Sequence, residues 1–200
     1  MHARGPYPEA ATATGAKTGA NMNTAALLDR DGVLNIDRGY THRPEDLVFV
    51  PGAIEAVRRL NQAGRRVIVI TNQAGVARGL YDEAAVERFH AAMNAALATQ
   101  GARIDAFYYC PFHPEASIAA YRHANHPDRK PNPGMVLRAL RDFDVAPVNA
   151  FLIGDRDSDL AAAAAAGVEG YLYEGGDLDA FVEQVLGAEN RTCSLEPPCL

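Results

Sequence analysis

The chain has little of what nucleic-acid-binding, membrane-spanning or disulfide-stabilised proteins need. Its 19 Lys and Arg are outnumbered by 25 Asp and Glu, and this net charge of -6 disfavours a nucleic-acid surface, because phosphate backbones bind basic patches. No apolar run approaches the roughly 20 residues that cross a bilayer, and the first residues lack a signal-peptide pattern. Cys110, Cys193 and Cys199 are too few and too dispersed for a disulfide framework, although the last two could pair. We therefore expect a cytoplasmic protein with reduced cysteines and with neither nucleic acid nor a membrane as partner.

Composition predicts one globular domain flanked by less ordered ends. With 48% hydrophobic residues in a chain of 200, a single domain can bury a sizeable core. Residues 1–23 are rich in Ala, Gly, Thr and Pro without a periodic apolar pattern, so we expect a disordered leader there. Residues 188–200 are expected to form a loose tail. The domain should therefore span residues 24–187, and we expect it to act as a monomer on a small molecule.

Apolar runs typical of buried strands alternate with segments of helical periodicity. Strands are predicted at residues 25–28, 66–70, 104–109, 150–153 and 170–173. The segments between them carry apolar residues at helical spacing, most clearly over 82–100, and a last helix is expected over 178–186. Strands that alternate with helices form parallel sheets with right-handed crossovers. The sequence therefore predicts an α/β fold with a Rossmann-like, doubly wound parallel sheet.

Polar side chains follow three of these strands at their carboxyl ends. Asp29 and Asp31 come directly after the first strand, Thr71 and Asn72 end the second, and Asp155 follows the fourth. In open parallel sheets the ligand binds beyond the carboxyl ends of the strands, at a topological switch point. Residues far apart in the sequence are thus predicted to meet in one site.

The two carboxylates that follow the first strand suggest chemistry on a phosphate ester. If the extended geometry persists past the strand, Asp29 and Asp31 face the same side, where their repulsion is relieved by a bound cation or by protonation of one. One carboxylate can then attack phosphorus while the other transfers a proton. The alternative is a solvated Asp-x-Asp-Gly turn, and the convergence of polar residues at the sheet edge argues against it.

Four short motifs resemble, in order and spacing, those of the haloacid dehalogenase superfamily of phosphatases. They are Asp-Arg-Asp-Gly-Val at 29–33, Thr-Asn-Gln at 71–73, Arg-Lys-Pro at 129–131 and Gly-Asp-Arg-Asp-Ser-Asp at 154–159. Residues 37–40, 71–79 and 109–111 look more closely like the heptose bisphosphate phosphatase branch, which adjoins the histidinol-phosphatase branch. The resemblance covers residues 24–186 and implies the haloacid dehalogenase fold, and the short gaps between the motifs leave no room for a large cap domain.

The resemblance implies a role for each of five catalytic residues. Asp29 would be the nucleophile that forms an aspartyl-phosphate, and Asp31 the general acid that protonates the leaving oxygen and then activates water. Thr71 would donate a hydrogen bond to the phosphoryl group, and Arg129 and Lys130 would supply positive charge.

A Mg²⁺ ion is implied as cofactor, held by Asp29, Asp155 and the backbone carbonyl of Asp31. Asp157 and Asp159 have two open interpretations: one of them supports the metal from outside its ligand shell, or Asp159 caps the helix that follows.

We expect an open site, in which the part of the substrate beyond the reacting phosphate contacts two loops. These are residues 37–40 and the loop before Arg129. The loop over 110–130 is long, irregular and rich in Pro and His, which favours a role in specificity. The candidate substrate-binding residues are Asp37, Arg38, Gly39, Tyr40, Asn72, Gln73, Arg129 and Lys130.

In the family that the chain resembles, this same loop often binds zinc through one histidine and three cysteines. Here Phe112 stands where the ligand histidine is usual, and Cys110 is the cysteine that remains. Cys110, His113, His123 and His126 nevertheless form a Cys-x-x-His plus His-x-x-His set compatible with tetrahedral zinc. A metal-free loop with exposed histidines is the alternative.

The expected function is that of a Mg²⁺-dependent phosphomonoesterase. The resemblance implies removal of the 7-phosphate of D-glycero-D-manno-heptose 1,7-bisphosphate, for ADP- or GDP-heptose used in lipopolysaccharide or surface polysaccharide. A histidinol-phosphate or other small-metabolite phosphatase is the alternative enzyme. A noncatalytic phosphometabolite-binding protein would have lost the nucleophile or the acid, whereas Asp29 and Asp31 are both present.

Overall fold

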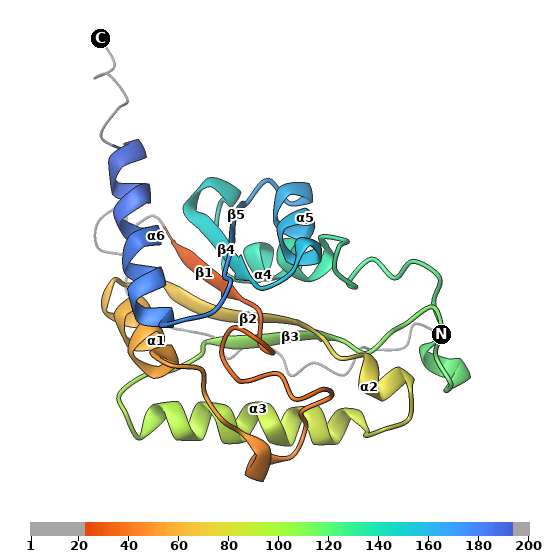
Figure 1. Ribbon diagram of the computed structural model, residues 1–200. Helices are drawn as coiled ribbons and strands as arrows, with labels where there is room; N and C mark the ends of the chain where they lie inside the picture. The colour runs from red at the N-terminus through yellow and green to blue at the C-terminus, as the bar shows by residue number, and fades with distance from the viewer. Residues whose placement is uncertain (1–22, 194–200) are drawn as a thin grey trace.

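The computed structural model describes residues 23–193, which form a five-stranded parallel sheet with helices on both faces (Figure 1). The strand order is β3-β2-β1-β4-β5. The strands are β1 (Ala25–Leu28), β2 (Arg66–Asn72), β3 (Ala106–Cys110), β4 (Ala150–Gly154) and β5 (Glu169–Leu172). The α/β, Rossmann-like prediction is confirmed. The second and fourth strands run one or two residues beyond their predicted ends, and the bounds of the third and fifth are shifted by one or two residues.

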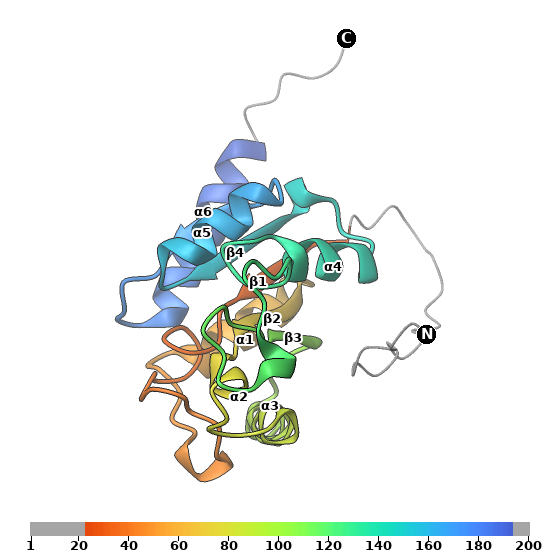
Figure 2. The same cartoon turned by 90° about the vertical axis from the view of Figure 1, so that its right-hand side faces the viewer.

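Alternate strand residues pack into two separate cores, one on each face of the sheet. The helices are α1 (Ala53–Gln62), α2 (Ala74–Ala77), α3 (Glu83–Ala98), α4 (Gly134–Asp142), α5 (Asp157–Ala165) and α6 (Leu178–Cys193). Ala26 and Leu28 of β1 face the core formed with α1, α3 and α6. Ala25 and Leu27 face the core formed with α4 and α5, and the two views of the ribbon show these helices on opposite sides of the sheet (Figures 1 and 2). A strand buried on both faces has to be apolar at every position, as β1 is.

Local sequence explains where α3 begins and how α5 packs on the sheet. Asp82 precedes α3 and its side chain accepts a hydrogen bond from the N–H of Ala85 at 2.8 Å, as expected for a helix N-cap. Val86, Phe89 and Met93 then bury one side of α3. In α5, the alanines allow close packing against β4 and β5, because they add little volume between helix and sheet.

The ends of the domain differ in part from the expectation. Residues 1–22 of the expected leader lie outside the described residues. The segment expected to be a loose tail from residue 188 instead continues α6 as far as Cys193, and residues 194–200 lie outside the described part. Within the described residues, none of the helices is long and apolar enough to cross a membrane.

The sheet topology places a crevice at the carboxyl end of β1. The chain adds β2 and β3 on one side of β1 and then returns to add β4 and β5 on the other. The order therefore reverses between β1 and β4, and neighbouring parallel strands diverge into their helices at such a point. Asp29 follows β1 and Asp155 follows β4, so both carboxylates reach this crevice.

Candidate active site

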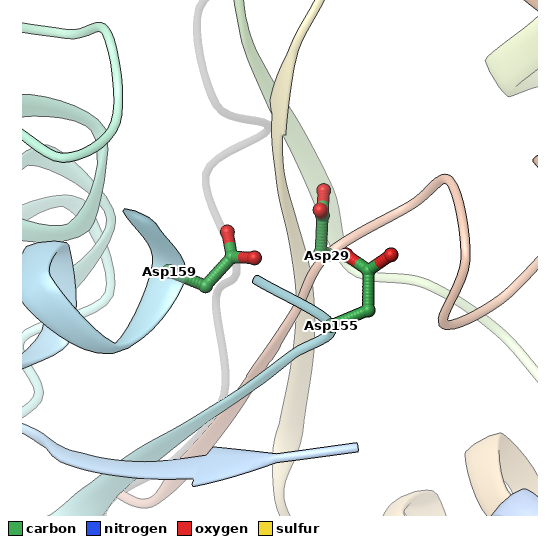
Figure 3. Close-up of side chains that lie close together, drawn as sticks. All are labelled: Asp29, Asp155 and Asp159. Atoms are coloured by element: carbon green, nitrogen blue, oxygen red, sulfur yellow. The ribbon is translucent and has the colours of Figure 1, made fainter. Parts of the chain in front are cut away.

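Three carboxylates converge at the crevice between β1 and β4. Asp29 follows β1, Asp155 follows β4, and Asp159 lies in the first turn of α5. One oxygen from each lies within 4.8 Å of the others, and the side chains turn toward one another in Figure 3. Gly32 allows this approach, because a Cβ built there would lie 2.2 Å from Oδ2 of Asp155.

Lys130 is buried against this cluster. Its Nζ lies 2.9 Å from Oδ1 of Asp29, contacts Oδ1 of Asp159 and donates to the carbonyl of Ile70 at 2.8 Å. Burial alone would lower the pKa of Lys130, but Asp29 and Asp159 outweigh it and raise that pKa. Lys130 is therefore a fixed positive charge, and it balances only one of three carboxylates.

The remaining negative charge fits a divalent cation with oxygen ligands. Among the described residues, these aspartates are the only group of three or more His, Cys, Asp or Glu side chains with ligand atoms this close. Oδ1 of Asp155 is buried and has no hydrogen-bond partner in the described part of the chain. Burial raises the pKa of Asp29 to about 7 despite Lys130, and a cation would oppose that shift by favouring the carboxylate.

Asp159 caps the helix that follows it, which was one of the two interpretations left open by the sequence. Its Oδ2 accepts a hydrogen bond from the N–H of Arg156 at 3.2 Å, which caps α5. Its other oxygen contacts Lys130 within the carboxylate cluster. Asp157 also lies in the first turn of α5 but is exposed and outside the cluster.

Asp31 lies at the edge of the same crevice and accepts hydrogen bonds at both carboxylate oxygens. Oδ1 accepts from Arg30 and from Nδ2 of Asn35 at 2.9 Å. Oδ2 accepts from Arg30 at 2.8 Å and from Nε2 of Gln73 at 3.0 Å. The side chain is 20% exposed, so a substrate can reach it while these donors hold it.

The polar residues at the end of β2 contact the protein itself. Asn72 donates to the carbonyl of Lys130 at 3.0 Å and accepts from its N–H at 3.1 Å, which clamps the Lys130 backbone. Gln73 is buried and donates to Asp31 and to Oγ1 of Thr71 at 3.0 Å, while it accepts from the hydroxyl of Tyr81 at 2.8 Å. The amide groups of Asn72 and Gln73, which we expected to bind substrate, thus have protein partners. Thr71 is buried, accepts from Gln73 and is not among the residues that line the cavity.

A cavity of about 500 Å³ opens above these residues. On one side it is bordered by the loop that carries Asp37, Gly39 and Tyr40, whereas the expected Arg38 side chain does not line it. Asp37 forms an ion pair with Arg156 at 3.0 Å, which ties this loop to the start of α5. The complete lining is Asp29, Asp31, Asp37, Gly39, Tyr40, Asn72, Gln73, Ala74, Arg78, Tyr81, His113, Arg129, Lys130, Arg156 and Ser158.

Positive charge gathers at another part of the cavity lining. Arg78 and Arg129 line it together with His113, and among the described residues neither arginine forms an ion pair. Burial lowers the pKa of Arg129, and the positive charge of Arg78 lowers it further. Burial also lowers the pKa of His113, with added contributions from both arginines. Such a cluster suits an anionic group on a ligand.

The structure does not support the zinc set. The ring of His126 stacks on Phe112 with centroids 4.0 Å apart, and His113 accepts from the N–H of Glu115 at 3.0 Å through Nδ1. Sγ of Cys110 lies 3.9 Å from Nδ1 of His126, and that nitrogen accepts a hydrogen bond from the N–H of Asp128 at 3.1 Å. The four proposed zinc ligands do not bring three ligand atoms close together; they are Cys110, His113, His123 and His126. Stacking of aromatic rings packs this loop instead.

Several residues of the site were not predicted from the sequence. Arg78 and Tyr81 lie just beyond the Thr-Asn-Gln motif, and Arg78 falls within the longer segment 71–79 that carried the family resemblance. Arg30 lies between the two predicted carboxylates, but its side chain gave no signal of its own. Arg156 and Ser158 lie within the fourth motif and also line the cavity.

The chain is similar in sequence to known sugar phosphatases. A family model described as HAD-hydrolase-like matches residues 128–189. The chain is 49% identical over 167 residues to the D-glycero-beta-D-manno-heptose-1,7-bisphosphate 7-phosphatase of Rhodopseudomonas palustris, covering 84% of this chain and 92% of that protein. It is 45% identical over 146 residues to the D-glycero-alpha-D-manno-heptose-1,7-bisphosphate 7-phosphatase of Burkholderia mallei, covering 73% of this chain and 77% of the relative.

A solved structure is similar to the chain in both fold and sequence. It is the D,D-heptose 1,7-bisphosphate phosphatase from B. bronchiseptica, complexed with magnesium and phosphate. The TM-score is 0.72 at 35% identity, and the match covers 82% of this chain and 99% of the other.

Proposed function

Because the chain belongs to the heptose bisphosphate phosphatase family of the haloacid dehalogenase-like hydrolases, we propose that it hydrolyses a heptose 1,7-bisphosphate at the 7-phosphate with Mg²⁺ as cofactor. The observation that carries this proposal is the composition of one cavity. Asp29, Lys130 and the acid–base candidate Asp31 line it, and so do the arginines Arg78 and Arg129, which have no acidic partner in the described residues. A substrate with two phosphate groups can place one beside Asp29 and Lys130 and the other at the two arginines.

In the proposed mechanism, Asp29 and Asp31 divide the chemistry. A carboxylate oxygen of Asp29 attacks phosphorus, and the bond from phosphorus to the sugar oxygen breaks. Asp31 gives its proton to that oxygen, so the sugar leaves as an alcohol. In the second step Asp31 takes a proton from water as the water oxygen attacks the aspartyl-phosphate, which frees phosphate and restores Asp29.

The other site residues lower the activation free energy of phosphoryl transfer through their positions and charges. Asp29 and Asp155 would hold Mg²⁺ together with the backbone carbonyl of Asp31, and the ion would neutralise charge on the phosphoryl oxygens. Lys130 adds a fixed positive charge beside the nucleophile. On this proposal the Thr71 hydroxyl donates to a phosphoryl oxygen. Phosphoryl transfer depends mainly on such positioning and electrostatic stabilisation.

The arginine pair favours a bisphosphate over a substrate with a single phosphate. Arg129 is half-buried and donates to the carbonyl of Phe112 at 3.2 Å, so its guanidinium is held in place at the cavity wall. Histidinol phosphate carries an amine instead of a second phosphate, and the amine would be repelled by Arg78 and Arg129. We therefore place the heptose bisphosphate ahead of histidinol phosphate as the substrate. On this proposal the product serves the synthesis of ADP- or GDP-heptose for surface polysaccharide.

Phosphate release with Mg²⁺ from a small panel tests the proposal. The panel contains the alpha and beta anomers of heptose 1,7-bisphosphate, fructose 1,6-bisphosphate and histidinol phosphate, because relatives of both anomeric names match the chain. We expect kcat/KM to be highest for one heptose anomer by at least about 100-fold, the size of preference that two or three extra charge-assisted hydrogen bonds can supply. Preference for histidinol phosphate would contradict the proposal. Asp29→Asn is the control and should abolish turnover.

A further inference from the structure

Arg30 is a fully buried arginine next to the proposed acid. It follows Asp29 in the loop after β1, and its side chain has 0% exposure. Burying an arginine costs free energy unless each of its donors finds a partner. The partners of Arg30 therefore indicate what the residue is for.

One edge of the guanidinium group holds the carboxylate of Asp31. Nη2 donates to Oδ1 at 2.9 Å and to Oδ2 at 2.8 Å, and Nε donates to Oδ1 at 3.2 Å. These contacts define the plane of the carboxylate, which a single donor could not do. Gln73 and Asn35 complete the set of donors around Asp31.

The rest of the guanidinium group is anchored in the protein. Nη1 lies 3.4 Å from Nε2 of His90, and the guanidinium carbon lies 4.6 Å from the centre of the Phe89 ring, both on α3. Burial lowers the pKa of His90 well below its usual value, and Arg30 lowers it further, so the imidazole is neutral and Nε2 can accept. His90 is itself held by stacking on Phe107 of β3 with centroids 4.4 Å apart.

Arg30 also reaches the loop that borders the cavity. Nη2 donates to the carbonyl of Thr41 at 2.7 Å. Thr41 is buried and directly follows Tyr40, which lines the cavity. The same guanidinium thus contacts α3, the acid and the cavity loop.

We propose that Arg30 is a positioning residue that fixes the carboxylate of Asp31 for proton transfer to the leaving oxygen, with His90 and the Thr41 carbonyl as its anchors. This inference rests on the proposed phosphatase function. Any buried arginine needs partners for its donors, but the partners of Arg30 are both oxygens of the proposed acid and the backbone next to Tyr40 at the cavity. A lysine at position 30 keeps the charge but cannot hold both carboxylate oxygens and both anchors, since it presents a point charge on a flexible stem.

Dependence on the leaving group tests this role. An alkyl phosphate needs its leaving oxygen protonated, whereas p-nitrophenolate leaves readily without a proton. For Arg30→Lys we expect kcat/KM on an alkyl phosphate to fall about 100-fold, near the lower limit for general acid catalysis. The first turnover of p-nitrophenyl phosphate should change less than about 5-fold and should appear as a burst of p-nitrophenol, because water activation by Asp31 is then slow.

A double-mutant cycle with Asp31→Asn shows whether the two residues act as a unit. If Arg30 acts through Asp31, adding Arg30→Lys to Asp31→Asn should lower alkyl phosphate turnover less than about 3-fold further. Additive losses, or an equal loss of Arg30→Lys on both kinds of substrate, would overturn the inference and leave the phosphatase function intact. If the wild-type protein hydrolyses no phosphate monoester at all, the proposed function is wrong, and the inference is overturned with it.

Two further variants separate the proposed role of Arg30 from a general effect on folding. Arg59→Lys is the matched control, because Arg59 forms a two-bond ion pair with Asp179, with both distances 2.7 Å, and neither residue lines the cavity. It should show no dependence on the leaving group. His90→Phe keeps an aromatic ring for stacking on Phe107 but removes the acceptor for Nη1. If Arg30→Lys does not fold, His90→Phe decides: a loss confined to alkyl phosphates supports the inference, and unchanged or uniformly reduced rates overturn it.

Discussion

Nζ of Lys130 lies 2.9 Å from Oδ1 of Asp29, and the same ammonium group contacts Asp159. Asn72 fixes the Lys130 backbone by two hydrogen bonds, so the end of β2 determines where this cation sits beside the end of β1. The proposed nucleophile and its neighbouring positive charge are thus held by three segments distant in sequence. This arrangement leads to predictions on both stability and activity.

Lys130→Met should abolish activity and also destabilise the protein at neutral pH. Removing the ammonium leaves the buried carboxylates of Asp29 and Asp159 without their partner, and breaking a buried ion pair in this way costs about 3–5 kcal/mol. Urea unfolding at pH 7.5 measures the loss. Arg103→Met removes a partner from an exposed ion pair with Asp105 and should cost less than about 1 kcal/mol. Equal stability of the two variants would contradict the prediction.

The stability of the metal-free protein should fall as pH rises. Burial raises the pKa of Asp29 from 3.8 to about 7, so between these values the folded state binds a proton that the unfolded state has lost. The stabilisation is complete below the unfolded pKa and disappears as pH rises through the folded pKa. Thermal unfolding from pH 4 to pH 8 in EDTA should therefore show a drop for wild type that is smaller in Asp29→Asn.

Mg²⁺ should counteract this loss of stability. A cation binds the ionised carboxylates, so it should raise the melting temperature more at pH 8 than at pH 5. The melting temperature of Asp29→Asn should rise less with Mg²⁺ at pH 8, because the amide at position 29 carries no negative charge to bind the ion. Parallel pH curves for wild type and variant, or equal gains from Mg²⁺ at both pH values, would count against this account of Asp29.

Gly32→Ala should weaken Mg²⁺ binding as well as stability. The Cβ would lie 2.2 Å from Oδ2 of Asp155, and the backbone has φ +90, so the variant combines a clash with strain. Gly64→Ala is the matched control, since its φ is +75 and nothing lies within 4 Å of its Cβ. We expect Gly64→Ala to lose about 1 kcal/mol of stability with unchanged Mg²⁺ dependence. Gly32→Ala should lose more and need a higher Mg²⁺ concentration for half-maximal activity.

Arg78→Met should affect a bisphosphate substrate more than a monophosphate. Its guanidinium lines the cavity, so its loss should raise KM for heptose 1,7-bisphosphate about 10-fold, the effect of one charge-assisted hydrogen bond. KM for p-nitrophenyl phosphate should change little. Arg88→Met, an exposed arginine outside this cavity, is the control and should leave both values unchanged. A similar rise of KM for both substrates in Arg78→Met would remove Arg78 from the second phosphate site.

The sequence by itself determined the sheet and the end of it that carries the site. Apolar, β-branched runs such as that of β2 are typical of buried parallel strands, and polar residues directly after such strands lie at the carboxyl edge of the sheet. For this reason Asp29 and Asp155 could be placed together from their positions along the chain alone. The helix signals at Asp82 and along α3 are equally local.

Only the tertiary structure decided which side chains contact one another. Gln73 and Asn72 have the same polar character as substrate-binding residues, and their protein partners lie on other loops. The spacing of the loop histidines was compatible with zinc, but packing of His126 on Phe112 fixed a different arrangement. Arg30 is one residue from two predicted site residues, yet its role depends on His90, sixty positions away. Local sequence determines backbone conformation and burial, whereas hydrogen-bond partners depend on how distant segments pack, and no local pattern encodes that packing.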